Sequence, residues 1–328
     1  MLIKLFIAMI VSFLFSAVIG NSLKNIFLKR GKFLAKGVPL AGGSGIWLGF
    51  MFSAIPLLLV LGSLSKQVIG IFLASSLMFI LGIWDDYKEM SVPAKFFAQS
   101  VATLLLVFFD IRTHIVFLPD SLNILVTFIW VLGITNAFNH LDVMDGVAGL
   151  IALVVSLGFG IVVWLNGDIR SLAIFLVISG ALCGFLINNL PPAKLYLGNS
   201  GSHFLGFILA AMALLVSYAS RNREVALFTP LLILGFPIFD TAFLMLVRLM
   251  KKKSVFLKSD DHLALRFLMI GHSKVKALFI MVVLALVFVL CGLGVYKSSN
   301  HWGIVTTVFA VISTAVLIRK AAGVRVND

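Results

Sequence analysis

Long apolar runs separated by short polar stretches make up most of the chain. A helix that spans a bilayer needs about 20 apolar residues, within a range of roughly 17 to 25. The runs are continuous and do not alternate with polar residues, so helices are expected rather than the strands of a barrel. The pattern predicts an all-α, polytopic membrane bundle that forms one transmembrane domain over residues 1–328. The eleven predicted spans are 2–20, 44–64, 67–84, 96–110, 121–138, 147–165, 171–190, 203–219, 226–249, 275–296 and 302–319.

The composition supports a membrane protein. Hydrophobic residues make up 61% of the chain and charged residues 12%, whereas a soluble domain is near half apolar and a quarter charged. The first apolar run has no small-x-small cleavage site after it, so we expect it to be retained as a helix. Cys183 and Cys291 both lie in apolar runs and indicate neither a disulfide framework nor a cysteine metal site.

The positive charge predicts the orientation of the helices. A net charge of +13 would suggest nucleic acid in a soluble protein, but Lys and Arg also accumulate in the cytoplasmic loops of membrane proteins. Most of the 26 Lys and Arg residues fall on one side of the predicted spans. That side is predicted to be cytoplasmic, with the N-terminus outside and the C-terminus in the cytoplasm.

Acidic residues are rare and gather on the same side. The chain has only 13 Asp and Glu residues, and carboxylates near a bilayer tend to be kept where they bind a cation or move a proton. Asp240 lies within the ninth predicted span. The predicted cytoplasmic ends hold Asp85, Asp86, Glu89, Asp142, Asp145, Asp260 and Asp261. We therefore expect any reaction to occur at the inner face.

Asp85 and Asp86 end the third apolar run, and Lys95 and Gln99 follow them. Adjacent carboxylates at a helix end can share a divalent cation, or one can bind metal while the other accepts a proton. Lys95 can hold a phosphate as a point charge. The alternative is a solvated loop after a helix, and the pair alone does not decide between the two.

A second polar group, Asn136, Asn139, His140, Asp142 and Asp145, lies between two apolar runs. Asn139, Asp142 and Asp145 are three residues apart, so on a helix they would line one side. Amides and carboxylates can read the edge of a base or ribose, and a carboxylate can bind Mg²⁺. A polar connecting loop is the alternative, although ordinary turns rarely need so many side-chain acceptors.

A third polar stretch covers Asn188–Lys194 and Gly198–Ser202. Its glycines and serines suit a loop whose backbone N–H groups approach a phosphate. A plain turn between helices fits the same pattern.

The last polar group, Asp260–Arg266, lies in the longest predicted cytoplasmic loop. His262 and Arg266 are four residues apart, so on one helical face they could clamp a pyrophosphate. The alternative is a basic stop signal at the lipid surface. Asp240 is a functional candidate because it is an acid inside a span, and a hydrogen bond to a neighbouring helix is its structural alternative.

In this order, the motifs resemble the polyprenyl-phosphate N-acetylhexosamine-1-phosphate transferase family, of the glycosyltransferase family 4 type, which includes the enzyme that forms lipid I. The resemblance implies a helical bundle with a cytoplasmic cleft in a bacterial inner (plasma) membrane. It implies transfer of a sugar-1-phosphate from a UDP-N-acetyl amino sugar to polyprenyl (undecaprenyl) phosphate, with release of UMP, as the first membrane step of a cell-envelope glycan. The matching elements are Val38–Gly43, Asp85–Gln99, Asn136–Leu150, Asn189–Ser202, Pro237–Thr241 and His262–Phe267.

The resemblance also implies a role for each matching residue and a metal cofactor, Mg²⁺, with Mn²⁺ as the alternative ion. Asp85 is expected to accept a proton or to orient the lipid phosphate, and Asp86 could exchange roles with it. The implied metal ligands are Asp86, Asp145 and Asn199; the implied substrate contacts are Asn136, Asn139, Asp142, Asn189 and Gly198; the implied phosphate contacts are Lys95, His262 and Arg266. Nucleic acid is not an expected partner, and a homodimer is left open.

Five positions depart from the family pattern: Leu40, Val143, Asn199, Ala264 and Leu265. Asn199 stands where the family has a metal-binding acid, so metal affinity would fall although the amide oxygen can still coordinate. The departures indicate either a divergent subfamily with its own sugar nucleotide or a catalytically weakened homologue that acts as a binding or scaffold protein. A secondary transporter is a further alternative, but it predicts acids spread through the spans and repeated halves.

Overall fold

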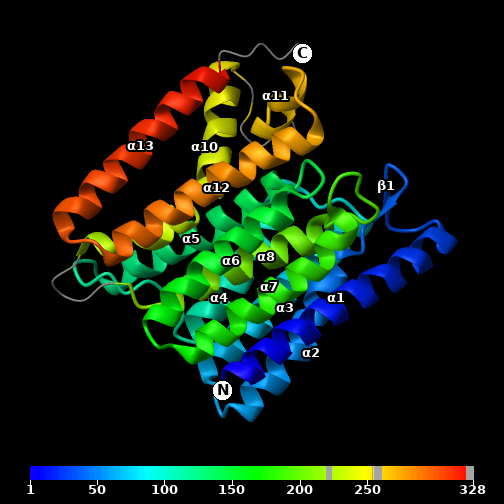
Figure 1. Ribbon diagram of the computed structural model, residues 1–328, viewed down its shortest axis with the longest axis horizontal. Coiled ribbons are helices and arrows are strands. Elements are labelled where there is room, and N and C mark those ends of the chain that lie inside the picture. The colour runs from blue at the N-terminus through cyan, green and yellow to red at the C-terminus, as the bar shows by residue number, and fades with distance from the viewer. Residues whose placement is uncertain (219–223, 253, 255–260, 323–328) are drawn as a thin grey trace. The chain divides into compact units, whose positions relative to one another are not determined.

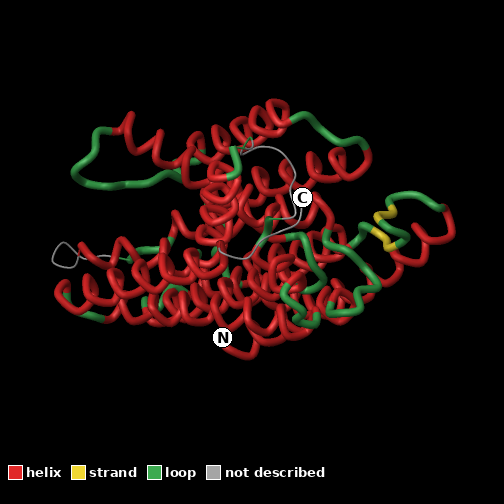
Figure 2. Tube along the Cα trace, turned by 90° about the horizontal axis from the view of Figure 1, so that it is seen from above, coloured by secondary structure: helices red, strands yellow, loops and turns green. Residues whose placement is uncertain are grey.

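The computed structural model describes residues 1–218, 224–252, 254 and 261–322. Apart from helices, these residues form one small antiparallel sheet, in which β1 (Leu34–Ala35) pairs with β2 (Val38–Pro39) (Figure 2). The chain divides into two compact units, unit 1 over Met1–Val216 and unit 2 over Ser217–Asp328. The division does not test whether the units act as one domain, so the single transmembrane domain stays a prediction.

Unit 1 contains the hairpin and the first helices of the chain (Figure 1). In Figure 1, α1 runs along the edge of this unit and the hairpin follows its C-terminal end. The helices are α1 (Leu2–Arg30), α2 (Gly42–Val60), α3 (Lys66–Tyr87), α4 (Val92–Phe108), α5 (Asp120–Leu141), α6 (Val147–Leu165), α7 (Ile169–Asn189) and α8 (Gly198–Leu215).

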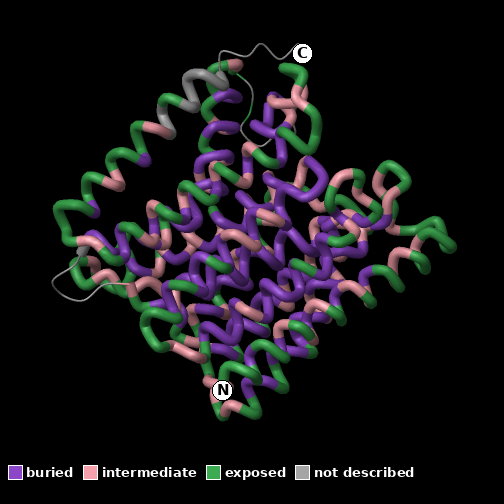
Figure 3. The backbone as a smooth tube through the Cα atoms, in the orientation of Figure 1, coloured by how far each residue is buried: buried purple, intermediate pink, exposed green. Residues whose placement is uncertain are grey.

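Helices α7 and α8 form the interior of unit 1. In their most apolar stretches 78% of α7 and 83% of α8 is buried, against 22% of α1. Helix α7 packs against α1, α2 and α6, while α8 packs against α2, α3 and α5. Figure 3 shows the buried residues gathered in the middle of this unit and the exposed ones along its outer helices. Polar residues at the start of α8 therefore lie where distant parts of the sequence meet.

Glycines allow other helices to approach α8 closely. A Cβ at Gly82 of α3 would lie 2.4 Å from the Cα of Ser200, and a Cβ at Gly43 of α2 would lie 2.3 Å from the backbone N of Gly201. Small residues allow this kind of backbone approach between membrane helices. Because Gly82 lies one turn before Asp85 and Asp86, the contact places both acids beside the N-terminus of α8.

Eight helices of the described part are long and apolar enough to cross a membrane, and a ninth span is formed if the bent pair in unit 2 is counted as one. The eight are α1, α2, α3, α5, α6, α7, α8 and α12. Helix α4 has only 17 residues, and α13 is helical but is not among the eight. The all-α membrane bundle is thus confirmed, while the predicted number of eleven spans is not.

In unit 2, the ninth predicted span is broken at Leu234. The segments Val225–Ile233 and Gly235–Met250 meet at an angle of 71°. The backbone N–H of Leu234 still donates to the carbonyl of Pro230, as broken helices at membrane depth require. The helices of this unit are η1 (Glu224–Phe228), α9 (Thr229–Ile233), α10 (Gly235–Met250), α11 (Leu263–Met269), α12 (Lys274–Lys297) and α13 (Asn300–Ala322).

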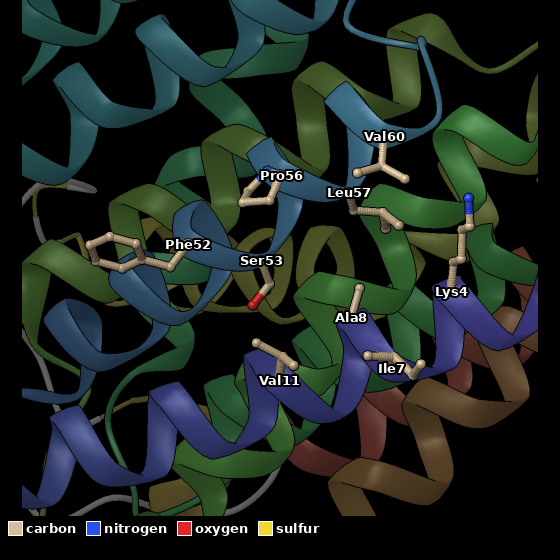
Figure 4. A pocket seen from close by; sticks show the side chains of 9 residues that line it. All are labelled: Lys4, Ile7, Ala8, Val11, Phe52, Ser53, Pro56, Leu57 and Val60. Carbon is tan, nitrogen blue, oxygen red and sulfur yellow. The ribbon is translucent and has the colours of Figure 1, made fainter.

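A shallow groove lies between the beginning of α1 and the end of α2 (Figure 4). Its lining is apolar except for Lys4 and Ser53, and Figure 4 shows the side chains of the two helices facing each other across it. None of the polar residues of the groups described below lines this groove.

Candidate active site

Asp86, in the last turn of α3, caps the N-terminus of α8. The backbone N–H of Asn199 donates to Asp86 Oδ1 at 2.7 Å, and that of Ser200 donates to Asp86 Oδ2 at 3.0 Å. The first N–H groups of a helix have no partner within the helix and carry the positive end of its dipole, so they favour a carboxylate. This contact joins residues more than one hundred positions apart in the chain.

Gly198, the first residue of α8, has a φ of +75°. A Cβ at this position would lie 2.7 Å from Asp86 Oδ2. Its backbone N–H donates to the carboxylate of Asp142. Glycine is needed here both for the left-handed backbone and for the close approach of the acid.

Asp85 is the more buried acid of the pair, with a side chain that is 1% exposed. Its Oδ1 accepts a hydrogen bond of 2.7 Å from the backbone N–H of Met90. Its Oδ2 lies 2.6 Å from Lys95 Nζ and 3.9 Å from His203 Nε2. Lys95 was expected to hold a phosphate; in the structure its ammonium group pairs with Asp85, so this acid is held as a fixed anion.

Asn139 links the end of α5 to the start of α8. Its Nδ2 donates to Asn199 Oδ1 and to Ser202 Oγ, both at 3.0 Å. The amide oxygen of Asn199 therefore faces the polar residues of α5, while its backbone N–H faces Asp86. One lone pair of this oxygen remains for a further contact.

Asp142 and Asp145 lie in the turn between α5 and α6. Helix α5 ends at Leu141, so the three-residue spacing of Asn139, Asp142 and Asp145 does not place them on one helical face as expected. Burial, followed by the charges of Asp86 and Asp145, raises the pKa of half-buried Asp142 to about 7, despite the N–H of Gly198. Three carboxylates therefore lie close enough to repel one another.

Asn189 ties this turn to the segment between α7 and α8. Its Oδ1 accepts from the backbone N–H of Gly146 at 3.0 Å, and its Nδ2 donates to the carbonyl of Leu195 at 2.8 Å. The side chain is buried, and both of its polar atoms are used within the protein. Its implied contact with the substrate stays a prediction, and the bonds seen here hold two loops together.

Asn136 and Gln99 form a reciprocal amide pair between α5 and α4. Asn136 Nδ2 donates to Gln99 Oε1 at 2.8 Å, and Gln99 Nε2 donates to Asn136 Oδ1 at 3.3 Å. Gln99 also lines a small pocket with Lys95 and His203. The pair fixes α4, and with it Lys95, against the helix that ends in the amide-rich segment.

In unit 2, Asp261 gathers two cationic side chains. Lys251 Nζ and Arg266 Nη2 each lie 2.9 Å from Asp261 Oδ1, and Arg266 Nε donates to the carbonyl of Asp261. Burial acts to raise the pKa of Asp261, but Lys251 and Arg266 outweigh it, so the pKa lies below its ordinary value. The guanidinium of Arg266 also lies 5.3 Å from the centre of the Phe243 ring.

Asp240 accepts a hydrogen bond from the backbone N–H of Leu263, the first residue of α11. This supports the structural alternative for this buried acid, because it anchors a short helix. His262 is buried and forms the N-cap position of the same helix. Asp260 lies outside the described residues.

Ten predicted site residues lie in unit 1, and each of them takes part in an interaction described above. They are Asp85, Asp86, Lys95, Asn136, Asn139, Asp142, Asp145, Asn189, Gly198 and Asn199. His262 and Arg266 belong to unit 2, so their phosphate contacts stay predictions. Gly198–Ser202, expected as a loop that meets a phosphate, is instead the first turn of α8. Its backbone N–H groups donate to protein carboxylates instead, those of Asp86 in α3 and Asp142 in the α5–α6 turn.

His203 was missed among the candidates. It follows Asn199 by four residues, so it lies one turn further along the same side of α8. It is 3% exposed and approaches Asp85. The signal in the sequence was a histidine at the beginning of an apolar run, which alone does not distinguish a functional residue from a structural one.

The donor set around Asp86 fits Mg²⁺. Hard oxygen atoms of Asp86, Asp142 and Asn199 lie at the start of α8, and the charges of Asp86 and Asp145 act on Asp142. In the described part of the chain, no group of three or more His, Cys, Asp or Glu residues forms a ready metal cage. Proteins commonly hold Mg²⁺ by one or two carboxylates together with waters and substrate phosphates.

The fold and this cluster define a multi-pass α-helical membrane protein with a site of carboxylates and amides at one end of its helices. The pattern of the family described as Glycosyl transferase family 4 matches residues 68–217. The match includes every residue of the cluster in unit 1. A relative that is 31% identical over 83% of this chain shows that the chain belongs to the polyprenyl-phosphate N-acetylhexosamine-1-phosphate transferases of this family.

Relatives with assigned names agree with this placement. The chain is 27% identical to the probable undecaprenyl-phosphate N-acetylglucosaminyl 1-phosphate transferase of Bacillus subtilis (strain 168), over 100% of this chain and 94% of that protein. It is 31% identical to the undecaprenyl-phosphate alpha-N-acetylglucosaminyl 1-phosphate transferase of Thermotoga maritima, over 83% and 85%. It is 31% identical to the phospho-N-acetylmuramoyl-pentapeptide-transferase of Levilactobacillus brevis, over only 42% and 48%.

Proposed function

We propose that this chain is an Mg²⁺-dependent enzyme that transfers a sugar-1-phosphate from a UDP-N-acetyl amino sugar to polyprenyl phosphate and releases UMP. The names of the relatives from Bacillus subtilis and Thermotoga maritima describe transfer to undecaprenyl phosphate. Both names also specify N-acetylglucosamine, and both relatives cover most of this chain, so we favour N-acetylglucosamine as the sugar. A bacterial inner membrane with the N-terminus outside accords with the distribution of Lys and Arg.

One observation carries the proposal: the acids of α3, the amide at the end of α5, the acids of the α5–α6 turn and the first turn of α8 meet in one cluster. Asp86 binds the N–H groups of Asn199 and Ser200, and Asn139 binds the side chain of Asn199. A transporter would need acids distributed along a pathway through the spans. A cluster at one end of the helices instead suits a reaction at one membrane face.

The residues of this cluster suggest a division of roles. A phosphate oxygen of the lipid attacks the phosphorus bonded to the sugar, and the bond from this phosphorus to UMP breaks. Asp85, fixed by Lys95 and Met90, orients the lipid phosphate or accepts its proton. Asn136, Asn139 and the α5–α6 turn are suited to the nucleotide. Positioning and charge stabilisation supply most of the catalysis in such a transfer.

The metal would be held by Asp86, Asp145 and Asn199, as the resemblance implies, with Asp142 beside them. When bound, Mg²⁺ offsets negative charge on the diphosphate and on the leaving UMP. Asp86 already accepts two backbone N–H groups, so it would contribute a remaining lone pair of its carboxylate. Asp145 Oδ2 accepts a hydrogen bond of 3.3 Å from the backbone N–H of Ala193.

The test is a reaction of purified protein with UDP-N-acetylglucosamine, undecaprenyl phosphate and Mg²⁺, with release of UMP and the mass of the lipid product as readouts. Turnover by the native chain and its loss in both Asp85→Asn and Asp86→Asn are the expected results. Unchanged turnover in these variants would defeat the site assignment. Flux of solute into proteoliposomes without UMP release would favour a transporter.

Asn199→Asp tests whether the metal centre is weakened. The substitution restores the acid that the family pattern has at this position, and the acceptor for Asn139 is kept. If the amide limits metal binding, turnover rises or the Mg²⁺ requirement falls. A native chain without turnover that gains it through Asn199→Asp would instead identify a weakened homologue.

A further inference from the structure

His203 is out of place in its surroundings. The segment from His203 to Ala213 in α8 is buried throughout and otherwise apolar. Burying an imidazole in such a helix costs free energy unless its nitrogen atoms have partners. No residue of the described part gives His203 Nδ1 a hydrogen-bond partner. The nitrogen atom that does face a polar group is Nε2, which lies 3.9 Å from Asp85 Oδ2.

The same oxygen of Asp85 also meets Lys95 Nζ at 2.6 Å. His203, Lys95 and Gln99 line one small pocket beside this acid, together with apolar side chains of α3 and α4. The carboxylate is therefore held from three directions: Met90 N–H binds Oδ1, while Lys95 and His203 approach Oδ2. Each partner comes from a different segment of the chain.

The unpartnered Nδ1 is informative about the proton on the ring. In a neutral imidazole one nitrogen donates and the other accepts. A proton on Nε2 would lie on the nitrogen nearer Asp85 Oδ2, 3.9 Å away, and would leave Nδ1 as a bare acceptor, whereas a proton on Nδ1 would bury an unmatched donor. The arrangement thus favours the form in which Nε2–H donates towards the acid.

We propose that His203 is a positioning residue that acts through Asp85. Its Nε2–H and the ammonium group of Lys95 together fix the direction of Oδ2, so that the carboxylate meets the phosphate of the acceptor lipid in one orientation. The proposal deepens and rests on the proposed transfer reaction. It assigns to His203 no contact with the UDP-sugar.

The experiment compares His203→Leu and His203→Gln with the native chain. Leucine fills the apolar site without a donor, and the glutamine amide can still donate towards Asp85. We expect kcat to fall about 10- to 100-fold in His203→Leu, the range typical of partners that orient a reacting group, and to recover in part in His203→Gln. KM for the UDP-sugar should stay within about twofold in both variants, because His203 is not proposed to contact this substrate.

Thermal melting separates positioning from packing. Since His203→Leu removes a buried nitrogen without a partner, its melting temperature should equal or exceed that of the native chain. His301→Leu, an exposed histidine of α13, is the control and should leave both activity and melting unchanged. A drop in melting temperature that parallels the loss of kcat in His203→Leu would overturn the proposal, as would native kcat.

A spectroscopic readout does not depend on turnover. The ¹⁵N shifts of the His203 imidazole, assigned by their loss in His203→Gln, should show a proton on Nε2 and should move in Asp85→Asn. A proton on Nδ1, or shifts indifferent to Asp85→Asn, would contradict the role. Absence of turnover in the native chain with these shifts as expected would defeat the proposed reaction and leave the Asp85–His203 contact intact.

Discussion

Each unit contains two aspartates, one that binds a helix N-terminus and one that pairs with a cation. The two units differ in the charges that surround these aspartates. In unit 1, Asp86 caps α8 and Asp85 pairs with Lys95. In unit 2, Asp240 binds the first N–H of α11, and Asp261 pairs with Lys251 and Arg266. One acid anchors a helix in both cases, and its companion holds a cation.

The difference lies in what surrounds each pair. Asp142 and Asp145 add negative charge near Asp86. Burial, followed by the charges of Asp86 and Asp145, raises the pKa of Asp142 to about 7. Two cations converge on Asp261 and lower its pKa despite burial. The cluster of unit 1 is therefore short of positive charge, which suits a bound cation, while the cluster of unit 2 is stabilised internally. Charge balance thus separates two clusters in each of which one acid binds a helix N-terminus and another acid binds a cation.

The strongest test of this contrast is Asp145→Asn in unit 1. The substitution keeps an oxygen acceptor for Ala193 N–H but removes a charge that would hold the metal. We expect turnover to fall by about 1,000-fold, since a metal contributes several kcal/mol to charge stabilisation. Melting in detergent should stay near the native temperature. Preserved turnover combined with a lower melting temperature would show that Asp145 is structural.

The matching change in unit 2, Asp261→Asn, should act on stability. It removes the carboxylate charge that pairs with Lys251 and with the buried Arg266, and breaking a buried pair costs about 3 kcal/mol. Thermal and denaturant unfolding in detergent measure the loss. Asp110→Asn is the control, because Asp110 is exposed and lies 3.7 Å from Arg112, so it should change stability by about 0.5 kcal/mol or less. Equal effects of the two substitutions would contradict the contrast.

A smaller loss of stability is expected at Gly198, where Asp86 caps the N-terminus of α8. Gly198→Ala should destabilise by about 2 kcal/mol, because the left-handed backbone opposes a side chain and the new Cβ would displace Asp86. Gly31→Ala is the matched control: Gly31 has a φ of +61° and nothing within 4 Å of an added Cβ. It should cost about 1 kcal/mol, from backbone strain alone. No difference between the two would mean that the contact with Asp86 contributes nothing.

The length of the apolar runs predicted the helices well where a helix consists of apolar residues from its first turn to its last. The prediction 147–165 coincides with α6, and 171–190 differs from α7 (Ile169–Asn189) by two residues at its start and one at its end. Helix α1 continues to Arg30, ten residues beyond the predicted end at 20, because a helix does not have to stop where its apolar residues do. The prediction of α8 at 203 missed its first turn for a different reason.

The residues of that first turn are polar, and they bind side chains from other helices, Asp86 of α3 and Asn139 of α5. Gly198–Ser202 forms a helix with Asp86 of α3 bound to its N-terminus, and no local pattern displays a partner so distant in sequence. The candidate acids and amides could be chosen from their residue types, and the structure places eight of them, with Lys95 and Gly198, in unit 1. Which atoms pair, and that His203 joins Asp85, depends on the packing of α3 against α8.

The last prediction uses the opposite pKa shifts. The pKa of Asp142 is raised from near 3.8 to about 7, so the folded state binds the proton more tightly. Its contribution to stability is full below pH about 4 and is lost as the pH rises to about 7. The lowered pKa of Asp261 acts in the other direction, giving stability that is lost only as the pH falls below about 4.

Asp142→Asn should therefore raise stability at pH 8 without Mg²⁺ by about 1 kcal/mol, after discounting for partial exposure, and should not change it at pH 4. Melting curves across this range measure the effect, and a loss of stability at pH 8 would show that Asp142 is already neutralised by a protein cation.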